Sequence, residues 1–459
     1  MEVQEIEHRE LPRLWELPPQ RVIEDGLRRI RGSGTVYKVM LLISAVCAIV
    51  GIIAFIVGPI SSGWNDRQAW TYVAITFGIL MCTIGSAPCF SVCLRMVRGH
   101  WRRPVNRLAE IWAIGMIVPL ILFFFLLGIL PDTVGRSSFW FGWPVSPYLW
   151  DSVMMVALVI CGYGFLYVGA LPDMAIARDQ IEGEGGGIFT RLSRGFRGTL
   201  YDWQIIDRAQ GILGAFYVLL YVGSMTVIAG DFIEALVPGD NSAIFPAQYT
   251  IEGLEAGIAV TIFAMGIMRY LGGLDEYLEA EQFFAAAKLQ LALGLLYFYT
   301  HWTEFIIWWY GRTPREVALL KIFYFEPYFW LFCVAFATMF LSPLFILVWT
   351  RVRMGIVGPW VTSGLVLVGI IIDNIRLYSA SFSTPNIYLQ ELSTIPKAYV
   401  PGVTDILLAV GLLGGAVGVC LLGFKLVPYP SIWEVTAGIY LRVRRKYLKT
   451  EVVLIGKPN

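Results

Sequence analysis

The chain has 459 residues, of which 57% are hydrophobic and 15% charged, with a formal net charge of +1 and a mean hydropathy of +0.65. A soluble chain carries about 25% charged residues, so this composition excludes an ordinary soluble protein. The sequence also lacks a basic run interleaved with aromatic residues, which argues against binding to nucleic acid.

In chain order, the sequence starts with a charged segment, residues 1–37, that has no apolar stretch followed by a small-residue cleavage site. We expect this segment to be an N-terminal arm outside the membrane. Apolar stretches of about 20 or more residues follow, each long enough to cross about 30 Å of hydrocarbon as a helix. The predicted spans are residues 39–60, 69–96, 107–130, 147–171, 209–236, 246–270, 282–309, 326–350, 356–380 and 402–426. The sequence thus predicts an all-α integral membrane protein with a transmembrane domain over residues 38–430 and a C-terminal tail over residues 431–459.

Basic residues are distributed unevenly between the two sides of the predicted bundle. Most of the 35 lysines and arginines lie in the two terminal segments and in the loops on the same side. The opposite side carries only Arg67, Arg136, Arg312, Arg315, Lys321, Arg376 and Lys397. The positive-inside rule therefore predicts that both termini are cytoplasmic.

A short segment recurs at the start of two predicted spans. Residues 147–151 (PYLWD) open the fourth span, and residues 327–331 (PYFWL) open the eighth. Proline, tyrosine and tryptophan are common at membrane boundaries, so chance is one interpretation. The other interpretation, which we favour, is a duplicated unit, with two four-helix bundles (helices 2–5 and 6–9) and flanking single helices.

Ionisable residues gather near the span ends on the side opposite the termini. They are Asp151, Asp231, Glu234, Glu252, Glu255, His301, Glu304, Glu326, Asp373 and Arg376. Because ionisable groups are costly inside a bilayer, each is a candidate functional residue, although a boundary residue can also reach headgroup water. The excess of carboxylates favours an outward-facing site that accepts protons and releases them outside.

Helical spacing relates several of these residues to one another. Glu252 and Glu255 share one face, as do His301 and Glu304, and the spacing predicts an ion pair between Asp373 and Arg376. Glu110 lies near the opposite end of the third span, three residues after Arg107. The sequence leaves two roles open for Glu110: a point of proton uptake, or a salt bridge to Arg107, which we favour.

The histidines and cysteines indicate no metal or haem site. Of His8, His100 and His301, only His301 lies inside a predicted span, so the chain cannot supply the two ligands of a b-type haem. The seven cysteines form no C-x-x-C pair, and we expect them to be packing residues. We predict that no cofactor is bound by this chain and that any redox group is a lipid-soluble substrate or belongs to another subunit.

Several segments together resemble one known family. Residues 102–110 (RRPVNRLAE) resemble the N-R-x-A-E motif of the polysulfide-reductase membrane-subunit (NrfD-like) superfamily, and residues 146–151 (SPYLWD) resemble its S-P-x-x-W-D motif. The similarity continues through residues 166–173 (LYVGALPD) and through Tyr299, Glu304, Trp309 and Gly311 in the seventh span. The most similar branch is the quinol-oxidising membrane subunit of bacterial alternative complex III, and the resemblance covers most of helices 2–9.

The resemblance implies a role in a respiratory or photosynthetic electron-transfer complex of the bacterial inner membrane. It implies a menaquinol pocket near the outer face, with Asp151 as proton acceptor. Trp140 and Trp150 are candidates to stack on the quinol ring, and the alternative for each is a place in the aromatic belt at the membrane interface. Electrons would pass to an iron–sulfur partner, and the other implied partners are cytochrome c subunits and a second NrfD-like subunit. Haem and iron–sulfur clusters would lie only in those partners. We also expect a proton path through this chain, along Glu110, Asp231, Glu252, Glu255, His301, Glu304, Asp373 and Arg376.

The sequence departs from the family at one position. The family's third helix ends P-L-x-H-L-G-R, whereas this chain has Leu122 where the histidine is expected. Quinol oxidation needs two proton acceptors, and the sequence supplies Asp151 but leaves the second acceptor unidentified. An alternative is therefore a quinol-inactive paralogue that acts as a scaffold or proton-conducting subunit. The third interpretation is a secondary transporter. Two features argue against it: the apparent repeats are parallel, and no pair of broken helices points to a site at the membrane midplane.

Overall fold

The computed structural model describes residues 17–32, 34–134, 136, 138, 141–182, 187–389, 391–392, 394–447 and 450–455. Its helices are α1 (Pro19–Arg31), α2 (Thr35–Phe55), α3 (Thr71–Leu80), α4 (Ala87–Val97), α5 (Arg103–Ile111), α6 (Ile117–Ile129), α7 (Tyr148–Ala177), α8 (Ile188–Leu192), α9 (Leu200–Phe232), α10 (Phe245–Tyr270), α11 (Ala280–Gly311), α12 (Pro314–Leu320), α13 (Phe329–Phe336), α14 (Ser342–Leu347), α15 (Thr350–Arg353), α16 (Val357–Phe382), α17 (Val403–Leu426) and α18 (Ile432–Leu441). Two strands follow, β1 (Arg442–Tyr447) and β2 (Thr450–Ile455).

Ten helices of the described chain are long and apolar enough to cross a membrane, which confirms the predicted fold class. They are α2, α3–α4, α5–α6, α7, α9, α10, α11, α13–α14, α16 and α17. Three of these spans change their winding midway, at Met81–Gly85, Trp112–Met116 and Ala337–Leu341, and a proline follows each irregular turn. Such turns accommodate a residue that cannot donate a backbone hydrogen bond.

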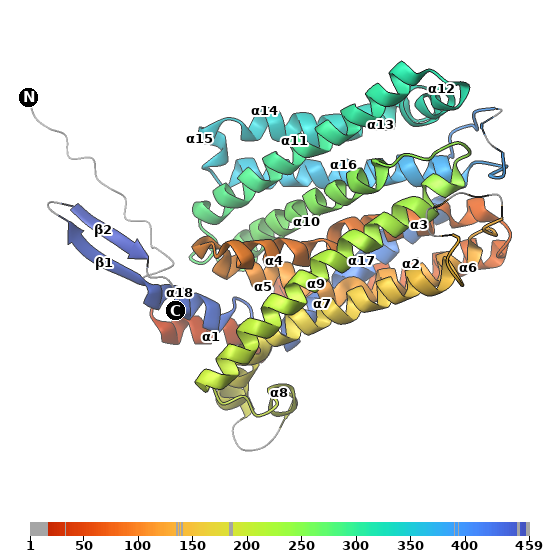
Figure 1. The fold of residues 1–459 in the computed structure, drawn as a ribbon. Helices are drawn as coiled ribbons and strands as arrows, with labels where there is room; N and C mark the ends of the chain where they lie inside the picture. Colours follow the sequence, from red (N-terminus) through yellow and green to blue (C-terminus); the bar gives the residue numbers. More distant parts are fainter. Residues whose placement is uncertain are drawn as a thin grey trace, which may run out of the picture.

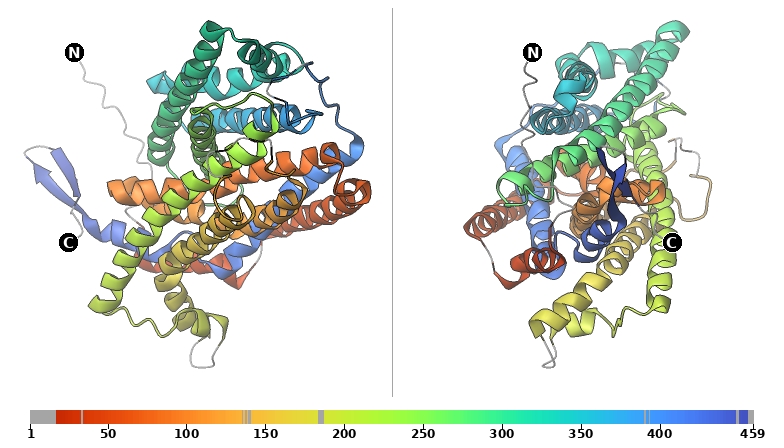
Figure 2. Two further views of the ribbon diagram at one scale, coloured as in Figure 1. Left: turned by 45° about the vertical axis from the view of Figure 1, so that its right-hand side comes forward. Right: turned by 90° about the vertical axis from the view of Figure 1, so that its left-hand side faces the viewer.

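The spans form two packed groups and a flanking pair. The helices from α3 to α9 pack together, and α10, α11, α13, α14 and α16 form the second group. The groups meet where α10 contacts α4 and α9, and α16 contacts α3. The α3–α4 span is the central one, since 94% of its most apolar window is buried. In Figure 2, α9 lies obliquely across the first group.

One span begins well before its predicted position. We predicted a start at residue 209, but α9 begins at Leu200. Thr199 and Asp202 form a capping box there: the Asp202 amide donates to the Thr199 hydroxyl at 3.2 Å, and the Thr199 amide donates to the Asp202 carboxylate at 3.1 Å. The cap satisfies amides that a helix start leaves without partners, so the helix extends into a polar segment that hydropathy assigns to a loop.

Helices α1 and α18, which belong to the two terminal segments, lie at one end of the bundle, which we call the α1–α18 side. Helix α12 lies at the other end, which we call the α12 side (Figure 1). Helix α1 belongs to the predicted N-terminal arm and packs against α17 and α18. The membrane part is helical as predicted. The tail also contains an antiparallel hairpin, with Arg442 opposite Ile455 and Tyr447 opposite Thr450, which the sequence analysis did not predict.

Helices α2 and α17 pack closely because glycines face each other across their contact. A Cβ placed on Gly51 would lie 2.7 Å from the carbonyl carbon of Gly411, and a Cβ on Gly411 would come closer still to Gly51. Small residues at such contacts let two membrane helices approach backbone to backbone.

We expect Gly411→Val to separate these helices and to lower the free energy of unfolding by about 1–3 kcal/mol, the usual effect of overpacking. Thermal unfolding of the detergent-solubilised protein measures the change. Gly211→Val is the matched control, because a Cβ on Gly211 meets no atom within 4 Å. Equal melting temperatures for the two variants would contradict the packing described here.

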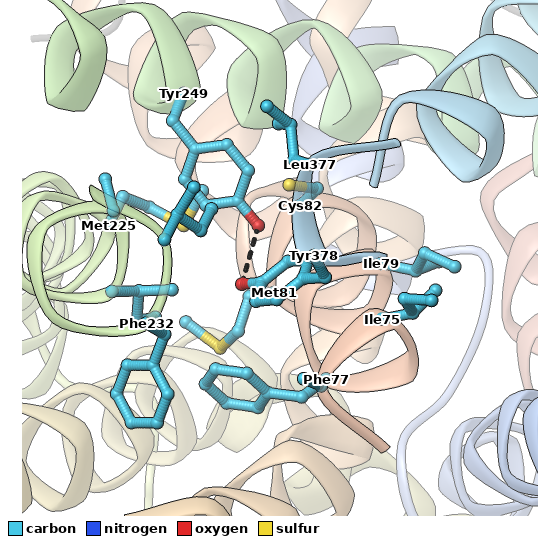
Figure 3. Packing of buried hydrophobic residues seen from close by; sticks show 14 of the residues in the cluster. Ile75, Phe77, Ile79, Met81, Cys82, Met225, Phe232, Tyr249, Leu377 and Tyr378 are labelled. Carbon is cyan, nitrogen blue, oxygen red and sulfur yellow. Dashed lines mark hydrogen bonds between the residues drawn. The ribbon is translucent and has the colours of Figure 1, made fainter. Parts of the chain in front are cut away.

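The apolar core between the two groups contains a few buried hydroxyl groups. Figure 3 shows Tyr249 of α10 and Tyr378 of α16 facing each other, with their hydroxyl oxygens 3.1 Å apart. The Tyr249 hydroxyl also donates to Asn374 Oδ1 at 3.0 Å. These tyrosines sit among apolar residues such as Phe77 and Met225, and they mark the edge of a much larger buried polar region in the second group.

Candidate functional site

A series of buried polar side chains lies on the facing sides of α10, α11 and α16. We call it the polar seam, and its members are Gln248, Glu252, Glu255, Gln282, Gln290, Tyr297, His301, Glu304, Asp373, Asn374 and Arg376. All of them are buried, and none has more than 3% of its surface exposed. Because polar groups are costly to bury, a series of this size in a membrane bundle indicates a function.

On α10, helical periodicity places three seam residues on one face. Gln248, Glu252 and Glu255 follow one another at spacings of four and three residues. Glu255 lies ten residues after Phe245, which is about 15 Å along the helix axis. It therefore lies deeper in the bundle than the sequence analysis indicated.

On α11, the seam runs along a single buried face. Gln282, Gln290 and Gly294 lie on this face, and Tyr297, His301 and Glu304 continue it towards the α12 side. Glu255 of α10 packs against Gly294, since a Cβ on that glycine would lie 3.2 Å from Glu255 Oε1. The absence of a side chain at Gly294 thus lets a carboxyl group enter between the two helices.

On α16, an ion pair and an amide complete the seam. Arg376 Nε donates to Asp373 Oδ1 at 2.7 Å, which confirms the predicted pair, and Arg376 Nη1 donates to the Phe323 carbonyl at 3.1 Å. Asn374 Nδ2 lies 3.5 Å from Glu252 Oε1, at the limit of a hydrogen bond. Glu252 is also close enough to interact electrostatically with Asp373, Arg376 and Glu255.

The seam reaches the α12 side through Glu304. Ser242 donates to Glu304 Oε1 at 2.7 Å, and the hydroxyl of Tyr324 donates to Glu304 Oε2 at 3.2 Å. A cavity of about 10 Å³ adjoins Glu304 and Asp240, which is about the size that one water molecule needs. Asp240 lies in the loop after α9, where burial and then the neighbouring Glu304 carboxylate raise its pKa well above the ordinary value.

Several seam groups have hydrogen-bonding capacity left over. Both carboxylate oxygens of Glu255 and the amide atoms of Gln282 and Gln290 have no hydrogen-bond partner among the described residues. Buried polar groups are nearly always satisfied by protein or by ordered water. The seam therefore has the chemical character of a hydrated path, with carboxyl groups that can carry a proton and amides that can hold water between them.

His301 belongs to the seam, and both nitrogens of its ring have hydrogen-bond partners. Its Nε2 lies 3.0 Å from the Gln248 amide nitrogen, and its Nδ1 lies 3.2 Å from the Tyr297 carbonyl oxygen. Gln248 donates to Nε2, and His301 then donates from Nδ1 to the carbonyl, which describes a neutral ring. His301 thus links α10 and α11 as a hydrogen-bonded neutral side chain.

A second buried site brings Asp151 and Asp231 together. Asp151 of α7 is fully buried, and its nearest charged neighbours are Asp231 of α9 and the guanidinium of Arg136. Arg136 donates to the carbonyl oxygens of Asp231 at 2.9 Å and of Ala235 at 3.3 Å. Two carboxyl groups on different helices thus face each other near the α12 side, with a single arginine beside them.

The two predicted quinol-ring tryptophans differ in what the structure shows. Trp150 is 39% exposed, its indole nitrogen donates to the Pro144 carbonyl at 3.0 Å, and its ring packs edge-on against Trp143. Its ring therefore lies on the outer surface of α7. Trp140 lies outside the described residues. Leu122, at the family's histidine position, is buried in the main apolar core.

Glu110 takes part in a third buried cluster, on the α1–α18 side. Arg107 donates to Glu110 at 3.0 Å and to Asp173 at 3.0 Å, and Arg95 donates to Glu110 at 2.7 Å. The salt bridge that we favoured for Glu110 is thus present. Ser91 also donates to Glu110, at 2.8 Å, so all hydrogen bonds of its carboxylate go to this cluster and none goes to the polar seam.

The C-terminal segment closes the same cluster. Ser431 donates to Asp173 at 2.8 Å, and Asn106 donates to Glu434 Oε2 at 3.0 Å. Burial alone would raise the pKa of Glu434, but Arg95, Arg102 and Arg107 together hold it below its ordinary value. Residues of the N-R-x-A-E-like segment therefore anchor α18 to the bundle.

Four residues of the site were not expected from the sequence: Gln248, Asn374, Asp240 and Tyr324. The spacing of Gln248 with Glu252 and Glu255 was a usable signal, because it extends one polar face of α10 by another turn. Asp240 and Tyr324 lie outside the spans, and no helical period relates them to Glu304. Among the described residues, no group of three or more His, Cys, Asp or Glu side chains is arranged to hold a metal ion.

Comparison with known proteins adds no assignment. No family model matches the chain, and a search of curated proteins finds no match.

Proposed function

We propose that this chain conducts protons through the polar seam, as a membrane subunit of an electron-transfer complex. The observation that carries the proposal is a buried polar series along one face of α11, from Gln282 to Glu304, which faces carboxyl groups of α10 and α16, including Glu255 of α10. Proton transfer needs groups that alternately bind and release a proton, together with water or hydroxyl groups between them. The seam supplies both.

The charge distribution gives the proposed path a direction. The terminal segments and the loops on the α1–α18 side hold most basic residues, which supports a cytoplasmic location for both termini in a bacterial inner membrane. Protons would then enter from the cytoplasmic side near Gln282 and leave through Glu304 and Asp240. The resemblance to the NrfD-like superfamily supports iron–sulfur and cytochrome c subunits and a second NrfD-like chain as partners.

The proposal is tested by counting protons in the native assembly. The purified complex is reconstituted in sealed liposomes with a pH-sensitive dye inside. Menaquinol supplies the electrons, and an added one-electron acceptor that binds no proton on reduction takes them up. Quinol oxidation alone releases one proton per electron on a single side. We expect additional protons to be moved across the membrane. A count that equals the release from quinol alone, with no uptake from the other side, would overturn the proposal.

A second candidate function is quinol oxidation at the Asp151–Asp231 pair. The specific observation in its favour is the approach of two buried carboxyl groups, because a quinol must give up two protons when it loses two electrons. Asp231 thereby supplies the second acceptor that is expected in the absence of a histidine at Leu122. The electrons would pass to an iron–sulfur partner on the α12 side.

Asp151→Asn distinguishes this candidate from a purely proton-conducting or scaffolding subunit. If quinol binds there, we expect a fluorescent quinol-site inhibitor to bind the native assembly several-fold more weakly in the variant, because asparagine lacks the charge that strengthens a hydrogen bond from a ring hydroxyl to a carboxylate. Ser152→Ala is the control, since Ser152 is the next residue and donates only to the Tyr148 carbonyl of its own helix. Unchanged inhibitor binding and turnover in Asp151→Asn would leave only proton conduction or scaffolding.

A further inference from the structure

A large cavity opens on the α1–α18 side, away from the polar seam and the Asp151–Asp231 pair. It has a volume of about 540 Å³, within the usual range for small-molecule sites, and lies between α4, α5, α9 and α18. Four arginines line it: Arg95, Arg98, Arg102 and Arg103. Asp207 is the single acidic residue in its lining. The polar part of the cavity lining is therefore mainly cationic.

The arginines are only partly neutralised by neighbouring carboxylates. Arg95 shares Glu434 with Arg102, whose Nη1 lies 3.3 Å from the Glu434 carboxylate. Arg103 donates to the backbone carbonyl of Glu434 at 2.8 Å, so it receives no carboxylate oxygen there. Arg98 is exposed and forms no ion pair among the described residues. Positive charge is thus left over at the cavity.

An anion such as a phosphate group fits this lining. Guanidinium groups bind phosphate oxygens through paired donors, and the charge left over at the cavity is positive.

Most of the remaining lining is apolar, and part of it comes from membrane-spanning helices. Val92 and Met96 come from α4 and Phe165 from α7, and Met96 is 72% exposed on the bundle surface. The arginines lie where α4 ends at Val97 and α5 begins at Arg103, which is the level of the membrane interface. A ligand that fits this cavity would place acceptor oxygens near the arginines and a hydrocarbon chain beside Met96, so it would be amphipathic. A free phosphate ion would use only half of the site.

We propose that this cavity binds the phosphodiester headgroup of an anionic phospholipid from the leaflet on the α1–α18 side, with an acyl chain along α4. Basic pockets between helices on the cytoplasmic side of a membrane are suited to such headgroups. The lipid would join α4 to α18 through a shared anion, beside the cluster that anchors the C-terminal segment.

The test measures lipid binding to the delipidated native assembly by native mass spectrometry, with phosphatidylglycerol compared with phosphatidylcholine at fixed ionic strength. Because partner subunits also bind lipid, the difference between variants identifies the site. We expect Arg98→Gln to weaken the retention of one phosphatidylglycerol roughly fivefold, which corresponds to one basic residue near a membrane surface. Arg103→Gln is expected to act in the same direction. Arg208→Gln is the matched control, an exposed arginine on α9 outside the cavity lining.

Three results would overturn the proposal. The first is equal phosphatidylglycerol retention by Arg98→Gln, Arg103→Gln and the wild type. The second is equal retention of phosphatidylcholine, which would show that the headgroup charge is not recognised. The third is complete displacement of the lipid by inorganic phosphate at equal concentration, which would identify a soluble anion as the ligand. Because Arg98 is exposed, its replacement leaves the fold intact and the test remains decisive if Arg103→Gln does not fold.

Discussion

Arg107→Met is expected to lower the free energy of unfolding by about 3–5 kcal/mol, the largest stability change that the structure predicts. Arg107 is fully buried and is the shared partner of Glu110 and Asp173, each at 3.0 Å. Methionine fills a similar volume but leaves Asp173 without a cation and Glu110 with Arg95 alone. An uncompensated buried carboxylate is costly, whereas a neutral replacement of a whole cluster can be tolerated.

The measurement uses a cysteine as a reporter of unfolding. Cys89 on α4 is 1% exposed, so a thiol reagent reaches it only when the first group of helices opens. We expect Arg107→Met to raise the rate of Cys89 labelling and Asp173→Asn in the same chain to recover part of the loss. Arg208→Met, at an exposed position, controls for the loss of one positive charge. Equal labelling in Arg107→Met and Arg208→Met would contradict the assigned role of the cluster.

Glu255→Gln is expected to have the largest effect on function. Glu255 lies against Gly294 near the middle of the proposed path, and both of its carboxylate oxygens lack a partner among the described residues. Glutamine keeps the shape of the side chain but cannot take up and release a proton. Since a positioned proton-transfer group contributes about 10²–10⁴-fold in rate, we expect transmembrane proton movement to fall by at least about tenfold.

The proton movement is followed in liposomes with the internal dye and is normalised to electrons transferred. Glu281→Gln is the control, because Glu281 lies on α11 near Gln282 but its side chain is 49% exposed, and its nearest cation is Arg442 at 3.6 Å. Glu255→Asp tests the chemistry, since it shortens the side chain and keeps the carboxyl group. If Glu255→Gln moves as many protons per electron as Glu281→Gln, Glu255 is not part of the proton path.

Hydropathy and charge were sufficient to predict the membrane fold. A span needs about 20 apolar residues, and the ten stretches in this sequence are long enough for their positions to be read directly. The start of α9 was missed because Thr199 and Asp202 extend a helix by capping, which hydropathy does not measure. The hairpin was missed because β1 is rich in arginine, and the alternating pattern that predicts a strand is absent from it.

The residues of the candidate site could be predicted less completely, because charged groups stand out in an apolar sequence and neutral polar groups do not. Intramembrane carboxylates are conspicuous in a sequence, so Glu252, Glu255, Glu304 and Asp373 were identified. Gln290 was not, although its burial without a partner is equally costly. The division of the ionisable residues between the polar seam and the Asp151–Asp231 pair depends on which helices are neighbours. Helical periodicity within one span cannot supply that information.

The central claim is that seam carboxyl groups change protonation during turnover, and infrared difference spectroscopy of the native assembly tests it most directly. Spectra are recorded between the resting complex and the complex during quinol-driven turnover. The account predicts a carboxyl C=O band in the wild type that is lost in Glu255→Gln and retained in Glu281→Gln. The account is contradicted if Glu255→Gln shows the same carboxyl bands as the wild type.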